Sequence, residues 1–587
     1  MRVRTIDEAA YVKLLRVSKR EEPADLWIRG AKVLHVYTKE WREVHIAISG
    51  ERIAYVGERE PLAGEQTEII DAAGSFAVPG YIEPHAHPFQ WYNPFSLADF
   101  ALERGTTTLI SDSLMLMSLP FEQVSRIMDQ LAEHPVKQYF WGRLDPQMRR
   151  DKAEPPFDRE SISRMLEHPR VVQGGELTDW QGVLREDETL LYGIKRTLDL
   201  GKRMEGHHPG ASEQTLNLAA AAGITACHES ITAEDVLRRL RLGMYVTLRH
   251  SSIRPDLPIL VKGLLEAGIP WSSRMMLTSD GSTPPIYRQG LMDGTIRVAI
   301  EAGMPPEEAY VMATLNPAVY YGIDSEVGGI APGRLGDILL LQSPEEPTPE
   351  LVIANGRLSA RQGELLVPTV KPDWSDYDFP QVAHGGHGGK EEWFRIRSEG
   401  EAVPVIHMLN AVITRLEWER LPVDDHGYVS FEQDPELALL CLIHPRKKRL
   451  AQAVVRGFCA DLEGLASTYT AADGWLVLGR CPRSMQQALQ RVLELGGGVV
   501  AWECGRAASE NPLPLAGRFS PASMADVIVR AEQLTDWLRQ KGHPHLDPLY
   551  SLLFFTATHL PYVRLTWEGI VDVKSGEILH PARVLSD

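Results

Sequence analysis

The stretch Val78-Pro-Gly-Tyr-Ile-Glu-Pro-His-Ala-His87 is the most informative part of this sequence. Two histidines separated by one residue on a strand project to the same side, because side chains alternate along a strand. Both imidazoles can then bind one ion, and imidazole suits divalent Zn, Mn or Fe. The pair follows a Pro-Gly turn and begins the first strand of an expected barrel, whose strand ends form the active-site face. This position predicts a metal site.

A large insertion begins at residue 79. The residues before and after it predict one small β domain built from two segments of the chain. Apolar and polar residues alternate at period two in 43–49 and 52–56, as in half-buried strands. A similar pattern returns at 337–341 and 350–356. We therefore assign 1–78 and 325–372 to a split β-sandwich domain that surrounds a larger insertion.

The insertion, residues 79–324, shows short apolar strands alternating with helical stretches, for example at 105–110 and 170–174. Thr232 is expected to cap a helix whose third position is Asp235. Strand–helix alternation over this length predicts an α/β fold, the (β/α)₈ barrel of the TIM type found in metallo-hydrolases. A doubly wound open sheet is the alternative, although no Gly-rich dinucleotide turn supports it.

Two further parts complete the chain. Residues 373–400 carry prolines, acidic residues and His384-Gly-Gly-His387, which predicts a linker that need not pack a core. The two histidines could bind a metal adventitiously, but a flexible loop is the favoured interpretation. Residues 401–587 predict an additional α+β domain, because helical spacing of apolar residues over 485–495 ends at Gly496 and a strand pattern follows at 499–502.

Composition excludes several classes of protein. Lys and Arg number 61 against 79 Asp and Glu, a net charge of −18 that argues against a nucleic-acid-binding surface. No apolar run approaches the roughly 18 residues of a membrane-spanning helix, and the N-terminus lacks a secretory signal pattern. The five cysteines form no C-x-x-C pair, so neither a disulfide framework nor a thiolate metal site is expected. A cytoplasmic location is the simplest interpretation.

Further residues of the metal-ligand type end predicted strands after the His85/His87 pair. They are Glu176, His207 with His208, His228 and Asp280. Each alone has an ordinary explanation: a carboxylate bonded to a loop amide, a core imidazole, or a helix cap. Together they predict two ions, with a carboxylate bridging them and Asp280 taking a proton from an activated water. There is no G-x-S-x-G or Walker-type motif, and a Cys227 nucleophile is disfavoured because its neighbour His228 would point to the opposite face.

The ordered set HxH, Glu, His, His, Asp within a split β domain resembles the amidohydrolase superfamily. Motifs elsewhere resemble bacterial-type adenine deaminases. The resemblance covers about residues 24–575 of this chain and implies a divergent member of that family. These motifs are Gly206-His-His-Pro-Gly210, Met312-Ala-Thr-Leu-Asn-Pro-Ala318, Gly329-Ile-Ala-Pro-Gly-Arg-Leu-Gly-Asp337, Glu494-Leu-Gly-Gly-Gly-Val-Val500, Pro512-Leu-Pro-Leu-Ala-Gly517 and Gly569-Ile-Val-Asp-Val573.

The resemblance implies a function and a site. It implies deamination of adenine to hypoxanthine and ammonia by a metal-activated hydroxide, with Asp280 as proton shuttle and Glu229 in a supporting role. It also implies Glu176 as the bridging carboxylate, His207 rather than His208 as a ligand, and a structural role for Asp337. The implied metal ligands are His85, His87, Glu176, His207, His228 and Asp280, holding two divalent ions per chain (Mn, Fe or Zn). The expected partners are a small purine substrate and a second copy in a homodimer, with no nucleic acid and no membrane.

Three stretches depart from the family pattern: 88–94 after the HxH motif, 110–115 on the next strand, and 470–475 in the C-terminal domain. The departures keep a second hypothesis open, in which the same centre acts on another aminopurine, a related heterocycle or a cyclic amide. The aromatic residues Phe89, Trp91 and Tyr92 could stack on such a ring or pack beneath a loop, and Trp91 and Arg249 are the candidate substrate contacts. A third hypothesis is a non-catalytic binding or assembly protein on the barrel fold.

Overall fold

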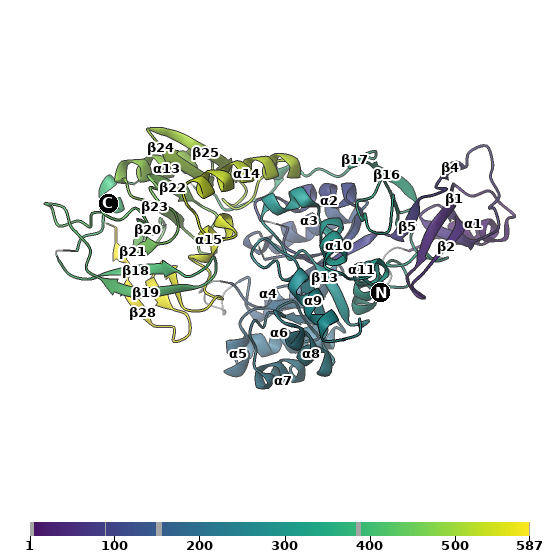
Figure 1. The fold of residues 1–587 in the computed structure, drawn as a ribbon, viewed down its shortest axis with the longest axis horizontal. Coiled ribbons are helices and arrows are strands. Elements are labelled where there is room, and N and C mark those ends of the chain that lie inside the picture. The colour runs from purple at the N-terminus through teal and green to yellow at the C-terminus, as the bar shows by residue number, and fades with distance from the viewer. Residues whose placement is uncertain are drawn as a thin grey trace.

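The computed structural model describes residues 5–88, 90–114, 116–147, 155–382, 389–398 and 400–585. Phe89, His384 and His387 of the sequence predictions lie outside the described residues. Figure 1 shows a β domain at one end, a barrel in the middle and the C-terminal domain at the other end. The predicted fold class, a TIM-type barrel with a split β domain and an additional C-terminal domain, is confirmed.

The β domain is one sheet made by both chain segments. Its strands follow the order β17-β16-β15-β14-β5-β1-β2-β3, with β4 also paired to β1. The antiparallel pairing of β14 with β5 places Leu340 beside Ala77 and joins the segments. The elements are α1 (Glu8–Lys19), β1 (Leu26–His35), β2 (Glu40–Ser49), β3 (Arg52–Gly57), β4 (Glu68–Asp71), β5 (Phe76–Pro79), β14 (Ile338–Leu341), β15 (Leu351–Ala354), β16 (Arg357–Arg361) and β17 (Glu364–Leu365).

The barrel is a parallel eight-stranded sheet in which β13 returns to lie beside β6. Its side chains are buried on both faces, as expected for strands covered by helices. In chain order the strands are β6 (Tyr81–Ala86), β7 (Thr106–Asp112), β8 (Lys137–Gly142), β9 (Val171–Leu177), β10 (Arg203–Gly206), β11 (Ala226–Cys227), β12 (Tyr245–Arg249) and β13 (Met275–Thr278).

Helices surround this sheet. The predicted cap of α8 is present, since the Thr232 hydroxyl accepts a hydrogen bond from the Asp235 amide and the Asp235 carboxylate accepts one from the Thr232 amide. The helices are α2 (Pro94–Glu103), α3 (Phe121–Ala132), α4 (Arg159–Glu167), α5 (Trp180–Leu184), α6 (Glu188–Asp199), α7 (Glu213–Ala221), α8 (Ala233–Arg241), α9 (Leu257–Glu266), α10 (Met292–Glu301), α11 (Pro306–Met312) and α12 (Leu315–Tyr321).

The C-terminal domain contains a large mixed sheet, a small antiparallel sheet and three α-helices among the described residues. The predicted helix is α13, which buries Met485, Leu489 and Val492. The elements are β18 (Val403–Met408), β19 (Thr414–Glu419), β20 (Leu437–His444), β21 (Arg449–Arg456), β22 (Gly464–Ser467), β23 (Trp475–Gly479), α13 (Pro482–Glu494), β24 (Gly498–Glu503), β25 (Arg506–Pro512), α14 (Met524–Gln540), α15 (Pro548–Phe554), β26 (Val563–Thr566), β27 (Gly569–Asp572), β28 (Ile578–Pro581) and β29 (Arg583–Val584).

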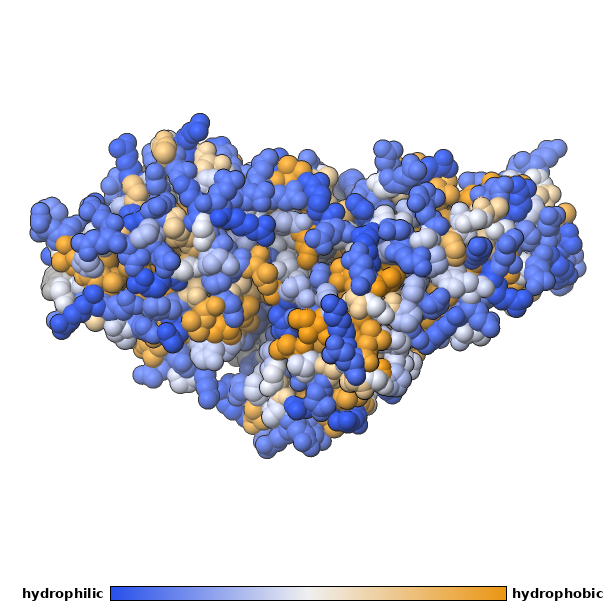
Figure 2. Space-filling view, viewed as in Figure 1, coloured by the Kyte–Doolittle hydropathy of each residue, from blue (hydrophilic) through white to orange (hydrophobic). Residues whose placement is uncertain are grey.

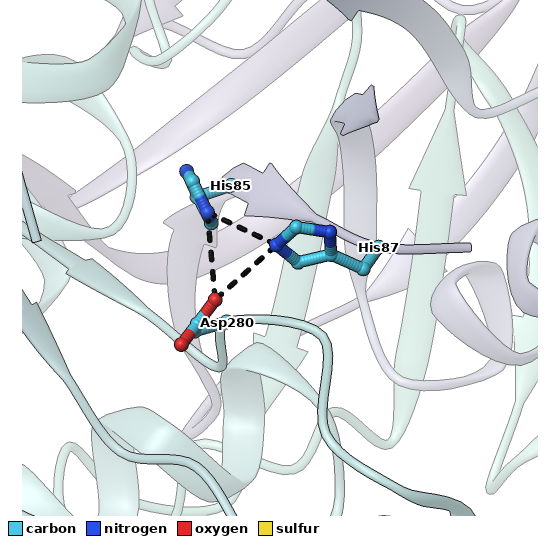
Figure 3. A group of neighbouring side chains, drawn as sticks. All are labelled: His85, His87 and Asp280. Atoms are coloured by element: carbon cyan, nitrogen blue, oxygen red, sulfur yellow. Dashed lines mark hydrogen bonds and ion pairs between the residues drawn. The ribbon is translucent and has the colours of Figure 1, made fainter. Parts of the chain in front are cut away.

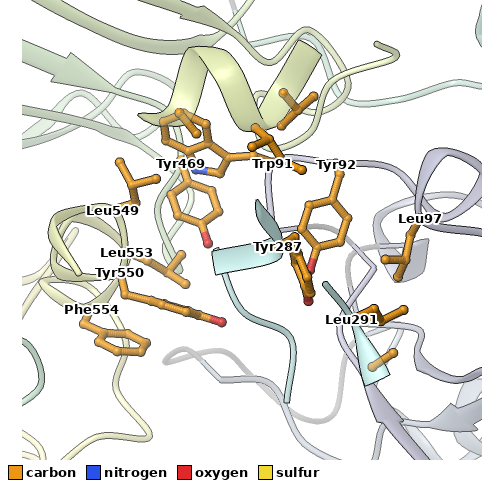
Figure 4. Packing of buried hydrophobic residues seen from close by; sticks show 14 of the residues in the cluster. Trp91, Tyr92, Leu97, Tyr287, Leu291, Tyr469, Leu549, Tyr550, Leu553 and Phe554 are labelled. Carbon is orange, nitrogen blue, oxygen red and sulfur yellow. The ribbon is translucent and has the colours of Figure 1, made fainter. Parts of the chain in front are cut away.

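An aromatic cluster packs the C-terminal domain onto the barrel (Figure 4). Trp91 lies edge-on to Tyr469, with ring centroids 5.8 Å apart, and its carbonyl accepts a 2.8 Å hydrogen bond from the Ser520 amide. The Tyr92 hydroxyl lies 3.0 Å from that of Tyr287. Trp91 is therefore an interdomain packing residue. Of the two roles that the sequence leaves open for Trp91, stacking on a ligand ring or packing, this environment favours packing, because the side chain is only 1% exposed.

The described part of the predicted linker, 373–400, packs at several aromatic positions. Tyr377 and Phe379 are buried with barrel side chains, whereas Phe394 is buried in the core of the C-terminal domain. Burial of these aromatic side chains is favourable, so the linker contributes to packing although its composition does not require it.

The face of the molecule in Figure 2 is largely hydrophilic, with apolar patches over the middle of the view. Among the described apolar residues, Ile259 of α9 is 65% exposed. Within the described chain, no helix combines the length and apolar character needed to cross a bilayer.

Candidate metal centre

The predicted ligands meet at the carboxyl ends of the barrel strands. His85 lies in β6 and His87 directly after it, Glu176 lies in β9, and the others follow β10, β11 and β13. Because parallel strands end at the same rim, residues nearly 200 positions apart in the chain reach one point. The structure thus brings together His85, His87, Glu176, His207, His228 and Asp280.

One group comprises His85, His87 and Asp280 (Figure 3). The Nε2 atoms of the two histidines lie 3.2 Å apart, and each lies 3.4 Å from Oδ1 of Asp280. Three ligand atoms from two strands therefore converge on a single point. The H-x-H spacing therefore places both imidazoles on the same side of the strand, as expected from the alternation of side chains.

A second group comprises His207, His228 and Glu229, and a third, His85, Glu176 and His228, shares one histidine with each of the other two. Oε1 of Glu176 is 2.7 Å from Nδ1 of His207 and 3.3 Å from Nε2 of His228. Glu176 also groups with His85 and His228, so it lies between the two sets of ligand atoms. Oε1 of Glu229 is 3.4 Å from both His207 Nδ1 and His228 Nε2, which places Glu229 among the ligand atoms rather than behind them.

Carboxylates outside the centre fix the orientation of three imidazoles. Glu205 accepts hydrogen bonds from Nδ1 of His85 (2.9 Å) and Nδ1 of His228 (3.1 Å), and Asp112 accepts one from Nδ1 of His87 (2.9 Å). With the proton on Nδ1, each Nε2 presents a lone pair to the centre. Imidazole lone pairs and buried carboxylates are the donors that divalent transition metals bind, so the residues present fit such ions.

Sequence reasoning missed Glu205. It lies two residues before His207 on β10, and Gln173 donates a third hydrogen bond of 2.9 Å to its carboxylate. Burial would raise the pKa of Glu205, but the adjacent His85 and His228 lower it to about 2. A buried carboxylate two residues from a ligand on the same strand is the signal that could have identified it.

Arg143 is a second missed residue, fully buried directly after β8. Its guanidinium contacts the carboxylates of Asp112 (2.5 Å) and Glu176 (3.0 Å). Burial would raise the pKa of each of these carboxyl groups, but Arg143 and the nearby histidines hold both pKa values below their usual range. Both groups are therefore anionic, as metal ligands and their supports must be.

Arg249, a candidate substrate contact, also supports the centre. Its guanidinium Nη1 lies 2.5 Å from Glu229 and 2.7 Å from Asp280, and the residue is only 3% exposed. Through these two contacts Arg249 positions both carboxylates. Arg254 adds a 3.0 Å contact to the other oxygen of Glu229. Burial would raise the pKa of Asp280, but Arg249 and the histidines hold it well below its usual range.

A cavity of about 100 Å³ opens beside the centre. The barrel contributes His87 and Asp112 to its wall, and the C-terminal domain contributes Ala471, Asp473 and His559, among others. A larger cleft of about 950 Å³ shares Asp473 and Arg518 with this cavity and leads outward between the domains. The C-terminal stretch 470–475, which departs from the family pattern, therefore forms part of the cavity wall.

The Glu205→Gln protein is expected to bind divalent metal about 10- to 100-fold more weakly than the unmodified protein. All three groups facing Glu205 are N–H donors, whereas an amide has only one acceptor oxygen and would turn its own N–H₂ toward one of them. Competition of Zn²⁺ or Mn²⁺ with a chromophoric chelator measures the change. Glu213→Gln on the exposed start of α7 is the matched control, and equal affinities for the two variants would exclude an orienting role for Glu205.

Comparison with known proteins agrees with this architecture. Residues 76–359 match the model described as "Amidohydrolase family", and residues 411–577 match "Adenine deaminase C-terminal domain". A Halalkalibacterium halodurans protein named "Putative adenine deaminase" is 38% identical over 97% of each chain. An adenine deaminase of Moorella thermoacetica is 31% identical over 95% of this chain and 96% of its own. A solved β-aspartyl dipeptidase of Fervidobacterium islandicum is 18% identical, with a TM-score of 0.46, over 59% of this chain and 99% of that one. The chain therefore belongs to the adenine deaminase family of amidohydrolases.

Proposed function

We propose that this protein is a metal-dependent hydrolase that converts adenine to hypoxanthine and ammonia. The observation that carries the proposal is the convergence of two groups of ligand atoms around Glu176, with Asp280 on one side. Relatives named adenine deaminase that align over nearly the whole chain support adenine as the substrate.

The proposal includes two divalent ions per chain, Mn, Fe or Zn. His85, His87 and Asp280 would hold one, His207, His228 and Glu229 would contribute to the other, and Glu176 would bridge them. Bound divalent ions would lower the pKa of a water ligand toward 7, which supplies hydroxide at neutral pH. The set of nitrogen and oxygen donors suits all three ions.

The residues of the chain supply positioning and proton transfer. Asp280 accepts one proton of the attacking water and delivers it to the amino nitrogen at C6 of the purine, while the water oxygen bonds to C6. The C6–N bond breaks, ammonia leaves, and the second water proton ends on ring nitrogen N1 of the 6-oxo product hypoxanthine. Arg249 keeps Asp280 ionised and fixed for this transfer, with a 2.7 Å contact to the oxygen that does not face the histidines. The C-terminal domain forms the part of the cavity wall that the barrel does not supply.

The test begins with protein stripped of metal and reloaded separately with Mn²⁺, Fe²⁺ or Zn²⁺. We expect adenine to be converted to hypoxanthine, followed by ultraviolet absorbance, only after reloading. The highest activity should coincide with about two ions per chain, because each group of ligand atoms converges on its own point. Full turnover by the stripped protein, or no turnover with any ion at that stoichiometry, would contradict the proposal.

The altered cavity wall at 470–475 favours one alternative, in which the same centre acts on another aminopurine, a related heterocycle or a cyclic amide. Ala471 and Asp473 from this stretch line the cavity. Profiling purines, pterins and cyclic amides with the reloaded protein separates the two, since the alternative requires a better substrate than adenine. The homodimer expected from the sequence remains a proposal, to be tested by light scattering on the purified protein.

A further inference from the structure

The strongest unused feature of the cavity is a histidine from the C-terminal domain. α15 ends at Phe554, beside the aromatic cluster of Figure 4, and the chain then brings His559 to the cavity wall. The His559 ring lies edge-on to the ring of His207, with centroids 6.3 Å apart. His559 is thus close to the metal centre, although it belongs to none of the groups of ligand atoms.

The hydrogen bonding of His559 determines what it can offer a ligand. Its Nδ1 lies 3.3 Å from the carbonyl oxygen of Gln147 and must carry a proton to donate to it. Nε2 has no hydrogen-bond partner within the described chain. In the neutral ring Nε2 is therefore an acceptor without a partner at the cavity wall.

Three other polar groups of the cavity wall have hydrogen-bond or ion-pair partners within the protein. Asp112 accepts from His87 and Arg143, the Gln90 side-chain oxygen accepts from the Tyr469 hydroxyl, and Asp473 pairs with Arg518. Leu553, Ala557 and Phe157 provide apolar contacts of the kind that suit a planar ring. An apolar cavity with a few fixed polar atoms selects its ligand by pairing those atoms.

The place of His559 on the barrel rim shows which part of a purine it would meet. Gln147 follows β8 and His207 follows β10, so His559 lies over the rim around β9. In the closed order of the eight strands β9 is four positions from β13, after which Asp280 lies. A purine whose C6 amino group faces Asp280 therefore presents its opposite part, the imidazole ring, toward His559.

We propose that Nε2 of His559 accepts a hydrogen bond from the imidazole N–H of the substrate, which makes His559 a specificity-determining residue for the free base. This inference rests on the proposed function. A purine substituted at N9, such as a nucleoside or 9-methyladenine, has no such N–H and leaves the Nε2 acceptor unpaired, which disfavours its binding.

Two variants separate recognition from support of the fold. Asn at position 559 can still donate an amide N–H to the carbonyl of Gln147, but it has no acceptor at the position of Nε2. Gln at position 559 is longer and can place its amide oxygen near that position. In His559→Asn we expect kcat/KM for adenine to fall about 10- to 100-fold while that for 9-methyladenine is unchanged, because one hydrogen bond is lost. His559→Gln should restore part of the preference for adenine. His426→Asn, in an exposed turn, is the control.

Binding of the product gives a readout that is independent of turnover. Calorimetry with hypoxanthine and 9-methylhypoxanthine should show the same loss of discrimination in His559→Asn and its partial return in His559→Gln. If the unmodified protein deaminates adenine but both variants keep its preference for the free base, the assignment of His559 is wrong and the proposed function stands. If the metal-loaded, unmodified protein neither binds hypoxanthine nor deaminates adenine, both fail together.

Discussion

The Asp280→Asn protein is expected to deaminate adenine about 10³-fold more slowly than the unmodified protein at equal metal content. Asn cannot accept the proton of the attacking water, so the transfer to the leaving amino group is lost. The backbone should tolerate the change, because Asp280 has φ 46°, in the left-handed region that Asn adopts readily. Steady-state kinetics on samples whose metal content has been measured gives the rate per loaded site.

Two features keep this experiment interpretable. Asp280 also contacts Arg249, so the loss of its charge can weaken metal binding as well as proton transfer. Normalising turnover to bound metal separates the two effects, and Asp199→Asn at the exposed end of α6 controls for a general effect of removing a carboxylate. Unimpaired turnover per loaded site would assign the proton transfer to another group.

The ligand residues could be predicted because the pattern along each strand locates its end. His85, Glu176 and Asp280 each close or follow an apolar run, and parallel strands that end at one rim must bring such residues together. An apolar run and the polar residue at its end are neighbours in the sequence, so this pattern can be recognised without knowledge of the packing. The split β domain could be predicted for a similar reason, since period-two alternation in two distant segments predicts two parts of a sheet.

The supporting residues could not be predicted, because their roles depend on partners from other strands. Arg143 supports the centre through its contacts with Asp112 and Glu176, and these residues of neighbouring strands meet only in the folded barrel. The contacts of Arg249 to Glu229 and Asp280 likewise join residues that follow or end different strands. For Trp91 the sequence leaves stacking and packing open, because it does not show that Tyr469, from a different domain, packs against the indole.

The largest expected effect on metal binding comes from Glu176→Gln. We expect affinity for divalent ions to fall further than the about 10- to 100-fold expected for a residue that only orients ligands. A Glu176 oxygen groups with His85 of the first group and His228 of the second, and the neutral amide supplies no charge to hold two cations close together. Adenine turnover should be lost at metal concentrations that saturate the unmodified protein.

The same substitution tests whether Glu176 contributes to metal affinity through its position between the ligand groups or to stability through its ion pair with Arg143. Gln fills the volume of Glu and can still accept a hydrogen bond from Arg143, so a loss of stability of only about 1–3 kcal/mol is expected from weakening that contact. Metal titration followed by thermal denaturation, with and without added Mn²⁺, measures both quantities on one sample. We expect Mn²⁺ to stabilise the unmodified protein by mass action and to stabilise Glu176→Gln much less, while Glu213→Gln should match the unmodified protein. Equal stabilisation of Glu176→Gln by Mn²⁺ would remove Glu176 from the metal centre, because a bridging carboxylate cannot lose its charge without weakening both ions.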